Sequence, residues 1–499
     1  MIGNGSTLKG KDSTKFQPLF NALAIFLLLA TLLVAGTQPA RAGGALVVNM
    51  TNEGHDAVPG DGICATASGG CSLRAAIEEA NAFPGADQII FGLPGSGIHV
   101  MSITLGALPA ITDVVVIDGT SQPKCVAPCI VISGASVGGA GNGFTLHASN
   151  SLIKGFIITS WTKSRGIMIV GDENEIQKND IGFWPGNPAL LPNGTGISIF
   201  GAKNRIGGGS AAERNVVSGN STKGIDIANG CCAIYTSNTI QGNFIGTNAA
   251  GNAPLGNHQT GVQVLSHATN TAIVDNVISS NSFWGIELAS ATDTSISGNK
   301  IGTNAAGTGA LGNGLGGIVV DTGAMNNTIG PAGPGSTIPN IIAFNRGPGV
   351  AVINATTVNN NITANSIFSN GGLGIDLAAT GVTPNDLRDP DRGPNMIQNF
   401  PLLRTATSAT HVITGMLNSR PSQTFALEFF ASPAGSCDPS GYGEGKKLIA
   451  MITVATDAAG NASFSASAVV AFPAGAVITA TATDVNGNTS EFSRCLVAK

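Results

Sequence analysis

Apolar residues alternate with other residue types along the middle of the chain, in short fragments that each begin with glycine. Such alternation has the period of a β-strand, because successive side chains of a strand point to opposite faces. The fragments begin 24 to 37 residues apart, which is room for three short strands and their turns, at Gly166, Gly196, Gly224, Gly261, Gly285, Gly317, Gly349 and Gly374. Stacked coils of this kind predict a parallel β-helix.

Asparagine recurs in register with these fragments. A thirteen-residue pattern with asparagine at its first and sixth positions occurs four times. Because asparagine tolerates left-handed turns and can hydrogen-bond along a stack of coils, the pattern predicts two ladders. One ladder would contain Asn215, Asn276, Asn340 and Asn365, and the other Asn220, Asn281, Asn345 and Asn370. Unrelated turn asparagines are the alternative.

A longer repeat supports this solenoid over other repeat folds. Residues 242–257 and 298–313 agree at twelve of sixteen positions. The chain lacks the motifs of leucine-rich and hexapeptide repeats, and its 5% of aromatic residues is low for a propeller. Uneven loop lengths favour the right-handed form. The expected fold class is all-β, with a right-handed parallel β-helix over residues 111–383.

Residues 1–42 have the features of a secretory signal peptide. Lys9, Lys11 and Lys15 precede an apolar run over residues 22–36, and Ala40-Arg41-Ala42 is a small-x-small cleavage signature. An uncleaved anchor is the alternative, although the run is short for a membrane span. After cleavage we expect no membrane span, because no other segment approaches that length. Export predicts a secreted or cell-surface protein.

The charge balance narrows the class of partner. The chain has 24 lysines and arginines against 29 aspartates and glutamates. Cleavage after residue 42 removes four basic residues and one acidic residue, which leaves 20 against 28 and a net charge of about −8. An acidic, weakly charged surface argues against nucleic acid and anionic membranes. Polysaccharides or cell-surface proteins are the expected partners.

Eight cysteines in an exported chain are expected to be oxidised. Proximity in the sequence predicts two disulfides, Cys64 with Cys71 and Cys125 with Cys129. A third, Cys437 with Cys495, would join the two ends of the last domain. Cys231 and Cys232 are adjacent, and either form a strained bridge or stay reduced. Zinc binding is not expected, because no second Cys or His pair stands at ligand spacing.

Residues 43–110 are expected to cap the solenoid. Ser72 to Ala82 forms the one convincing amphipathic helix, with Ser72 as its N-cap and Leu73, Ala76, Ile77 and Ala80 on one face. The open end of a β-helix exposes unpaired backbone and an apolar core, so an element must cover it. This helix is the predicted lid.

The helix carries a family resemblance. Cys71-Ser72-Leu73-Arg74-Ala75-Ala76-Ile77, followed by Asn81 and by Gln88-Ile89-Ile90-Phe91, resembles the CSLREA-type N-terminal module of secreted bacterial β-helix proteins. Ala75 stands where the motif's name has glutamate. With the repeats and the C-terminal region, the resemblance covers nearly all of the mature chain. It implies export and a pectate-lyase-like right-handed β-helix, but no agreed activity and no catalytic residue.

If the protein is an enzyme, its catalytic residues are expected in one column of outward-facing positions along the solenoid. The position between the two aliphatic residues of each fragment points outward, and holds Met168, Ser198, Asp226, Gln263, Glu287, Val319, Ala351 and Asp376. Asp226 and Glu287 would lie about 10 Å apart at one strand spacing per coil. That separation is near the upper limit for the carboxylates of an inverting glycosidase. Asp226 and Glu287 are therefore the candidate catalytic residues of a glycoside hydrolase or polysaccharide lyase.

The sequence lacks the catalytic motifs of known enzymes with this fold, which argues against an enzyme. The sequence has neither the Asp-Asp and Gly-His-Gly of polygalacturonases nor the Asp-Pro-His-Asp of alginate epimerases. It also shows no match to the arginine base and calcium-binding carboxylates of pectate lyases. The favoured function is noncatalytic: an extended surface for glycan or protein binding, in adhesion or as a scaffold. The polysaccharide-acting enzyme is the alternative, because fold alone confers no activity.

After the last repeat the composition changes twice. Residues 384–401 form an aspartate-rich linker, in which Asp386, Asp389 and Asp391 either bind Ca²⁺ or are neutralised by Arg388 and Arg392 within turns. From residue 402 to 499 longer alternating strands and turn clusters predict an Ig- or fibronectin-like β-sandwich. The expected strands are His411 to Leu417, Phe425 to Phe430, Leu448 to Thr456, Ala462 to Val469 and Val477 to Thr483.

Overall fold

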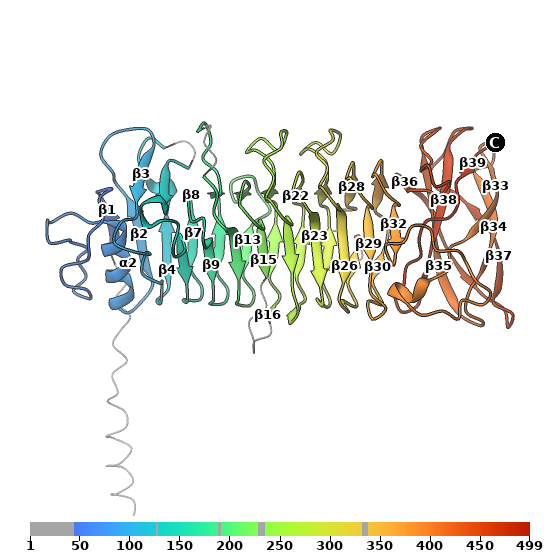
Figure 1. The fold of residues 1–499 in the computed structure, drawn as a ribbon, viewed down its shortest axis with the longest axis horizontal. Helices are drawn as coiled ribbons and strands as arrows, with labels where there is room; N and C mark the ends of the chain where they lie inside the picture. The colour runs from blue at the N-terminus through green and yellow to red at the C-terminus, as the bar shows by residue number, and fades with distance from the viewer. Residues whose placement is uncertain (1–43, 126–127, 188–190, 228–234, 332–337) are drawn as a thin grey trace, which may run out of the picture. The chain divides into compact units, whose positions relative to one another are not determined.

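The computed structural model describes residues 44–125, 128–187, 191–227, 235–331 and 338–499. The expected signal peptide, together with Cys231 and Cys232, lies outside these residues. Residues 43–499 form one compact unit, in which a row of stacked coils leads to a β-sandwich (Figure 1). Within the described residues the helices are too short or too polar to span a lipid bilayer.

Three parallel sheets run the length of the solenoid, and from β4 onward each coil contributes one strand to each sheet. Sheet one contains β1 (Ala45–Val48), β2 (Asp87–Phe91), β4 (Val115–Asp118), β7 (Leu152–Lys154), β10 (Glu175–Gln177), β13 (Arg205–Gly207), β17 (Thr239–Gln241), β21 (Ala272–Val274), β24 (Ser295–Ser297), β27 (Thr328–Ile329) and β30 (Asn361–Ile362). Sheet two contains β3 (His99–Ser102), β5 (Ile130–Ser133), β8 (Phe156–Thr159), β11 (Asp180–Ile181), β14 (Val216–Val217), β18 (Phe244–Ile245), β22 (Val277–Ile278), β25 (Lys300–Ile301), β28 (Ile341–Ala343) and β31 (Ser366–Phe368). Sheet three contains β6 (Phe144–Leu146), β9 (Arg165–Ile169), β12 (Thr195–Ile199), β15 (Ile225–Ile227), β19 (Val262–Val264), β23 (Trp284–Ala289), β26 (Gly316–Asp321), β29 (Val350–Val352) and β32 (Ile375–Leu377).

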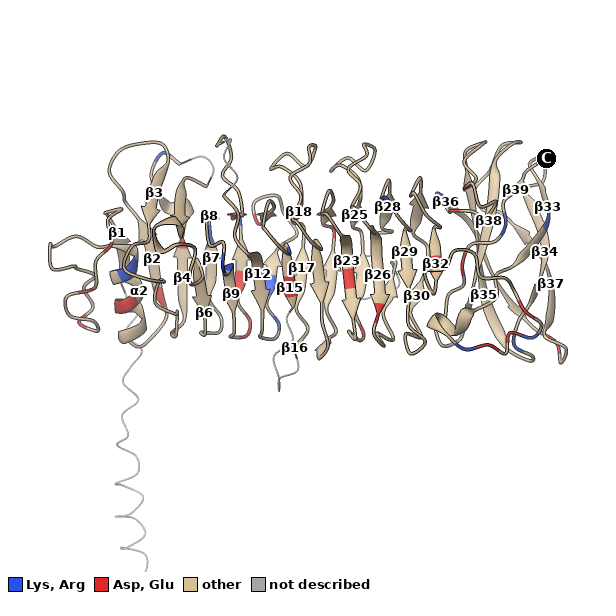
Figure 2. Ribbon diagram, viewed as in Figure 1, with Lys and Arg blue, Asp and Glu red and all other residues tan. Residues whose placement is uncertain are grey.

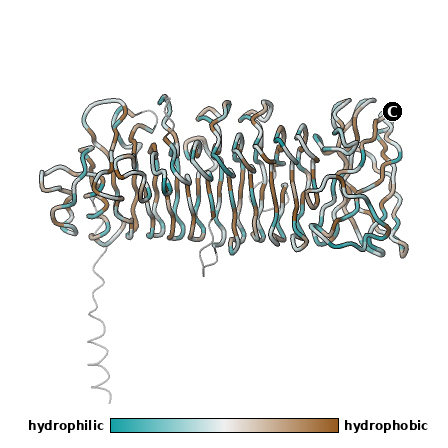
Figure 3. Tube along the Cα trace, in the orientation of Figure 1, coloured by the Kyte–Doolittle hydropathy of each residue, from teal (hydrophilic) through white to brown (hydrophobic). Residues whose placement is uncertain are grey.

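The core consists of aliphatic side chains stacked in register. In sheet one a column from Leu46 to Ile362 holds one inward aliphatic residue per coil, and most of these side chains have no exposed area. Figure 3 shows hydrophobic segments along the strands of every coil. Full burial of each such side chain contributes about 1.5–3 kcal/mol. The repeated alternation in the sequence is therefore the source of the solenoid's stability.

Asparagine ladders run along the turns, and the structure confirms both predicted ladders and extends them. The first ladder is Asn179, Asn215, Asn243, Asn276, Asn299, Asn340 and Asn365. The second is Asn193, Asn220, Asn257, Asn281, Asn313, Asn345 and Asn370. A third, which the sequence patterns did not predict, has two segments, Asn174, Asn204 and Asn238, and Asn327, Asn360 and Asn395. In each ladder the donors of one asparagine point to Oδ1 of the asparagine in the next coil.

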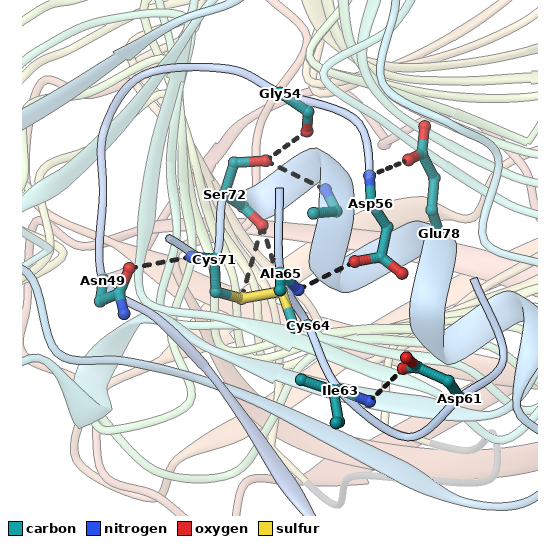
Figure 4. The surroundings of a disulfide bond; sticks show 11 residues. Asn49, Gly54, Asp56, Asp61, Ile63, Cys64, Ala65, Cys71, Ser72 and Glu78 are labelled. Carbon is teal, nitrogen blue, oxygen red and sulfur yellow. Dashed lines mark hydrogen bonds between the residues drawn. A yellow bond between two sulfur atoms is a disulfide. The ribbon is translucent and has the colours of Figure 1, made fainter. Parts of the chain in front are cut away.

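The solenoid begins earlier than the expected boundary at residue 111, because β1, β2 and β3 already belong to its sheets. Helix α2 (Leu73–Ala82) covers its first coils as predicted. Ser72 is the N-cap: its hydroxyl accepts from the Ala75 amide at 3.1 Å and donates to the Gly54 carbonyl at 2.6 Å. Beside it Cys64 and Cys71 form a disulfide (Figure 4).

The C-terminal region is a β-sandwich of two antiparallel sheets. One sheet is β33 (Leu402–Thr407), β34 (Val412–Asn418) and β37 (Asn461–Ser467), and the other is β36 (Lys447–Ala455), β35 (Thr424–Ser432), β38 (Val477–Asp484) and β39 (Leu496–Val497). The five expected strands are present within two residues of their predicted ends. The sequence prediction missed β33 and the two-residue β39. The structure also contains the Cys125–Cys129 and Cys437–Cys495 disulfides.

The sandwich closes the C-terminal end of the solenoid with glutamate side chains. Glu444 accepts hydrogen bonds from the Ser369 and Asn370 amides and from Asn370 Nδ2. Glu491 accepts from the amides of Leu377 and Thr383. These carboxylates stand where the next coil would place its acceptors. The sandwich is thus packed against the solenoid as its cap.

Candidate functional site

The outward column of sheet three is assembled as the sequence predicted. Strand register places Ser198 beside Asp226, Asp226 beside Gln263, and Gln263 beside Glu287. The register continues through Val319 and Ala351 to Asp376. Charged residues are sparse along the coils (Figure 2). Asp226 and Glu287 are thus two strand spacings apart, about 10 Å, with Gln263 between them.

Most of the column is buried, although the sequence predicted a solvent-facing surface, and Glu287 is half-buried. Asp226 is 7% exposed, Gln263 is 9% exposed and Ser198 has no exposed area. Neighbouring side chains provide the cover: Arg165 Nε donates to Ser198 Oγ at 2.8 Å, and Lys223 Nζ lies 3.8 Å from Asp226 Oδ2. Because side chains of adjacent strands pack against one another along a flat sheet, a position that points outward can still be shielded from solvent.

The two candidate catalytic carboxylates differ in environment. Burial raises the pKa of Asp226, while Ser198, Lys223 and Arg165 act to lower it. Glu287 Oε2 accepts a hydrogen bond from Thr260 at 3.1 Å. Oδ1 of Asp226 and Oε1 of Gln263 have no hydrogen-bond partner in the protein. Two strand spacings are near the upper limit of the 6.5–9.5 Å that places one water between an acid and a base.

A groove of about 720 Å³ lies between the outer face of sheet two and the sandwich. We call it the joint groove. Phe344, Phe368 and Phe472 line it, and the rings of Phe344 and Phe368 meet edge to face at 5.6 Å. The exposed Lys446 and Lys447 are also among its lining residues, and Lys446 Nζ stands 4.5 Å from the centroid of the Phe368 ring. The groove combines apolar ring surface with positive charge.

Sequence reasoning missed the joint groove. Its two sides come from β28 and β31 and from sandwich residues about 70 to 130 positions further on, which no local pattern connects. A partial signal is present, because Phe344 and Phe368 occupy partly exposed positions of the repeat in an aromatic-poor chain. Phe344 also has a φ of 62°, an uncommon conformation for a bulky residue.

The structure brings the three aspartates of residues 384–401 together. Carboxylate oxygens of Asp386, Asp389 and Asp391 lie within 4.8 Å of one another. Asp389 is 1% exposed. Burial raises its pKa to about 6, although hydrogen bonds from Ser419 and Asn399 act to lower it. Burial, followed by the charge of Asp386, raises the pKa of Asp391. We call this set the aspartate cluster.

Comparisons with known proteins identify similar structures but no family. No family model and no curated protein sequence matches the chain. The enzymatically active domain of bacteriophage CBA120 tailspike protein 2 matches with 13% identity and a TM-score of 0.30, over 85% of this chain and 73% of that one. The A-module of Azotobacter vinelandii mannuronan C-5 epimerase AlgE6 matches with 16% identity and a TM-score of 0.34, over 61% of this chain and 74% of that one. The periplasmic alginate epimerase AlgG matches with 14% identity and a TM-score of 0.31, over 60% and 67%.

Structural similarity with such low sequence identity and TM-scores carries no argument about the chemistry of this chain. The parallel β-helix rests on the sheets of this chain. The resemblance to the CSLREA-type module stays a prediction, although its residues have clear roles here. Cys71 is in a disulfide, Ser72 caps the helix, and Arg74 pairs with Glu53 at 2.7 Å.

Proposed function

We propose that this protein is an exported, noncatalytic β-helix protein that binds glycans, and that the joint groove is its binding site. The observation that carries the proposal is the combination of phenylalanine rings and two lysines in one groove of ligand size. Small-molecule sites are typically 300–1,000 Å³, lie at domain interfaces and pair apolar walls with a few polar groups. The proposal rests on these residues and not on the names of the similar structures.

The chemistry of the groove favours an acidic sugar. Aromatic rings offer apolar surface to the C–H face of a sugar ring, and exposed lysines attract carboxylates. Lys446 and Lys447 are two adjacent positive charges in a chain whose mature net charge is about −8. A short uronate-containing segment fits this pattern better than a neutral glycan.

The column of sheet three supports the noncatalytic half of the proposal. Catalysis by Asp226 and Glu287 needs both carboxylates to reach one substrate bond. Asp226 is buried beside Lys223, and Gln263 lies between the two acids. A polysaccharide hydrolase or lyase remains the alternative hypothesis, and the unpartnered oxygens of Asp226 and Gln263 are the observation in its favour.

A polysaccharide panel tests both halves. The purified protein is titrated with acidic and neutral oligosaccharides by calorimetry, and the same mixtures are assayed for new reducing or unsaturated ends. We expect binding of acidic oligosaccharides without product, and at least a tenfold loss of affinity in Phe368→Ala and in Lys446→Ala. Lys163→Ala removes an exposed lysine outside the groove and should bind as the wild type does.

Two outcomes would overturn the proposal. Product release that is lost in Asp226→Asn or Glu287→Gln would establish the enzyme. Unchanged glycan binding in both groove variants would place the glycan site elsewhere.

A further inference from the structure

The aspartate cluster concentrates negative charge in one loop between the solenoid and the sandwich. Its carboxylate oxygens approach within 4.8 Å. Like charges at this distance repel unless a proton or a cation lies between them. Each of the three residues has an Oδ1 atom that is buried and has no hydrogen-bond partner in the protein. Buried polar atoms are nearly always partnered, so three orphan acceptors together require an explanation.

Asp389 shows that the cluster is built and not incidental. Its side chain is 1% exposed. Oδ2 accepts hydrogen bonds from Gln398 Nε2 at 3.0 Å, from the Asn399 amide at 3.2 Å and from Ser419 Oγ. Those three donors hold the carboxylate in place and leave Oδ1 as its free oxygen. A buried carboxylate oriented by three donors on one oxygen has the arrangement of a supported metal ligand.

Among the arginines, Arg420 acts on the cluster, because its charge acts to lower the pKa of Asp389 and Asp391. Arg388 and Arg392 are exposed, and across the described residues no ion pair joins either of them to an aspartate of the cluster. Arg420 approaches, but its Nε donates to the main-chain carbonyl of Asp389 at 3.4 Å. Ion pairs with Arg388 and Arg392, which would have neutralised these acids, are therefore not observed in the described part of the chain.

Asparagines hold the loop that carries the cluster. Asn385 Nδ2 donates to the Phe400 carbonyl, and Asn385 Oδ1 accepts from the Phe400 amide. Asn399 Oδ1 accepts from the Asp386 amide, and Asn399 Nδ2 donates to the Asp386 carbonyl. These reciprocal bonds fix both ends of the loop around the aspartates, so the carboxylates are positioned before any ligand arrives.

We propose that the aspartate cluster binds one Ca²⁺ ion, with Asp386, Asp389 and Asp391 as ligands. Ca²⁺ takes six to eight oxygen ligands in flexible geometry, and main-chain carbonyls and water complete the set that carboxylates begin. Mg²⁺ keeps most of its water and seldom uses three carboxylates. Because Ser419 and Asn418 of the sandwich bond to this loop, the ion strengthens the attachment of the loop to the sandwich. This inference is independent of the glycan proposal.

Calorimetric titration of the chelator-treated full-length protein with CaCl₂ tests the site. We expect one ion per chain, weaker binding of MgCl₂, and a thermal unfolding midpoint that rises with CaCl₂ concentration. Asp389→Asn should abolish measurable binding, and Asp391→Asn should weaken it at least tenfold. Asp293→Asn removes one exposed carboxylate from a turn of the solenoid and is the matched control.

The less buried Asp391 keeps the test decisive if Asp389→Asn fails to fold. Circular dichroism establishes that each variant is folded before titration. A folded wild type without calcium-dependent heat or stabilisation would overturn the proposal. Wild-type affinity in Asp391→Asn would do so as well.

Discussion

At their N-terminal ends the asparagine ladders begin on main-chain amides, whereas at the C-terminal end of the solenoid groups of the sandwich accept from the last asparagines of two ladders. The first asparagine of each ladder accepts a hydrogen bond from a main-chain amide through its Oδ1: Asn174 from Ser151, Asn179 from Phe156 and Asn193 from Trp161. The second ladder ends when Asn370 donates to Glu444, and the third ends at Asn395, whose Nδ2 donates to the main-chain carbonyl of Thr489. A ladder therefore has a direction, and its last member presents donors that need an acceptor.

Glutamates at the two ends of the solenoid also differ in the direction of their pKa shifts. At the N-terminal end, burial acts to raise the pKa of Glu53, but bonds from the Thr104 and Leu105 amides and from Arg74 lower it overall. At the C-terminal end, burial raises the pKa of Glu428, Glu444 and Glu491. One end is closed by a helix and a buried ion pair, and the other by acids that bind main-chain amides.

Removal of Arg74 should have the largest effect at the N-terminal end. The Arg74 and Glu53 side chains are 4% and 6% exposed, and Arg74 also donates to the carbonyls of Gly106 and Ala107. Arg74→Ala removes the ion-pair partner of Glu53 and leaves its Oε1 without a donor, which should cost about 3–5 kcal/mol in the free energy of unfolding measured with urea. Lys154→Ala breaks the less buried pair with Asp118 and should cost about 1 kcal/mol or less. Equal losses would contradict the assignment of Arg74 to the cap.

A break inside a ladder should cost slightly less than a break in the cap. Asn276 donates to the Ile240 carbonyl and to Asn299, and accepts from the amide and Nδ2 of Asn243. Asn276→Ala should therefore lower the free energy of unfolding by about 3 kcal/mol, because several buried partners lose their bonds. The exposed Asn252→Ala serves as control, and a matching loss there would show that the ladder adds nothing.

The C-terminal end should depend on the presence of an acceptor. Glu444→Gln keeps one oxygen for Asn370 and loses the acceptor of the Ser369 amide, so it should cost about 1 kcal/mol. Glu444→Ala removes both acceptors and should cost about 2–3 kcal/mol. Urea unfolding of the two variants side by side distinguishes them. If glutamine proves no better than alanine, charge matters more here than the directional ladder.

A pH dependence is expected at the C-terminal end as well. Burial raises the pKa of Glu491 from 4.5 to about 7, although the Thr383 and Leu377 amides oppose the shift. The folded state thus binds a proton between pH 4.5 and 7 that the unfolded state releases. The contribution of Glu491 to stability is full below pH 4.5 and is lost as the pH rises through 7. Thermal unfolding from pH 5 to 8 should show a smaller decline in Glu491→Gln than in the wild type, and equal declines would contradict the shift.

Part of the fold was predictable because it repeats. The asparagine pattern identified eight ladder members but left out Asn243 and Asn299, which belong to a different sequence repeat and lie in the intervening coils. The third ladder escaped because Thr271 and Thr294 occupy its middle coils, immediately before β21 and β24. The aspartate cluster was visible as three acids close in sequence. The unpartnered oxygens of these acids, which distinguish a binding site from a turn, could not be seen in the sequence.

The sequence by itself determined which residues face the core and which share a column, because the alternation of a strand assigns every side chain to a face. It also determined the helix cap and the strands of the sandwich, since these depend on neighbours within a few residues. Only the tertiary structure decided that most of the Asp226 column is buried, that Glu444 ends a ladder 74 residues away, and that phenylalanines and lysines share a groove. Exposure and partnership depend on atoms brought together from distant segments, and local patterns do not contain that information.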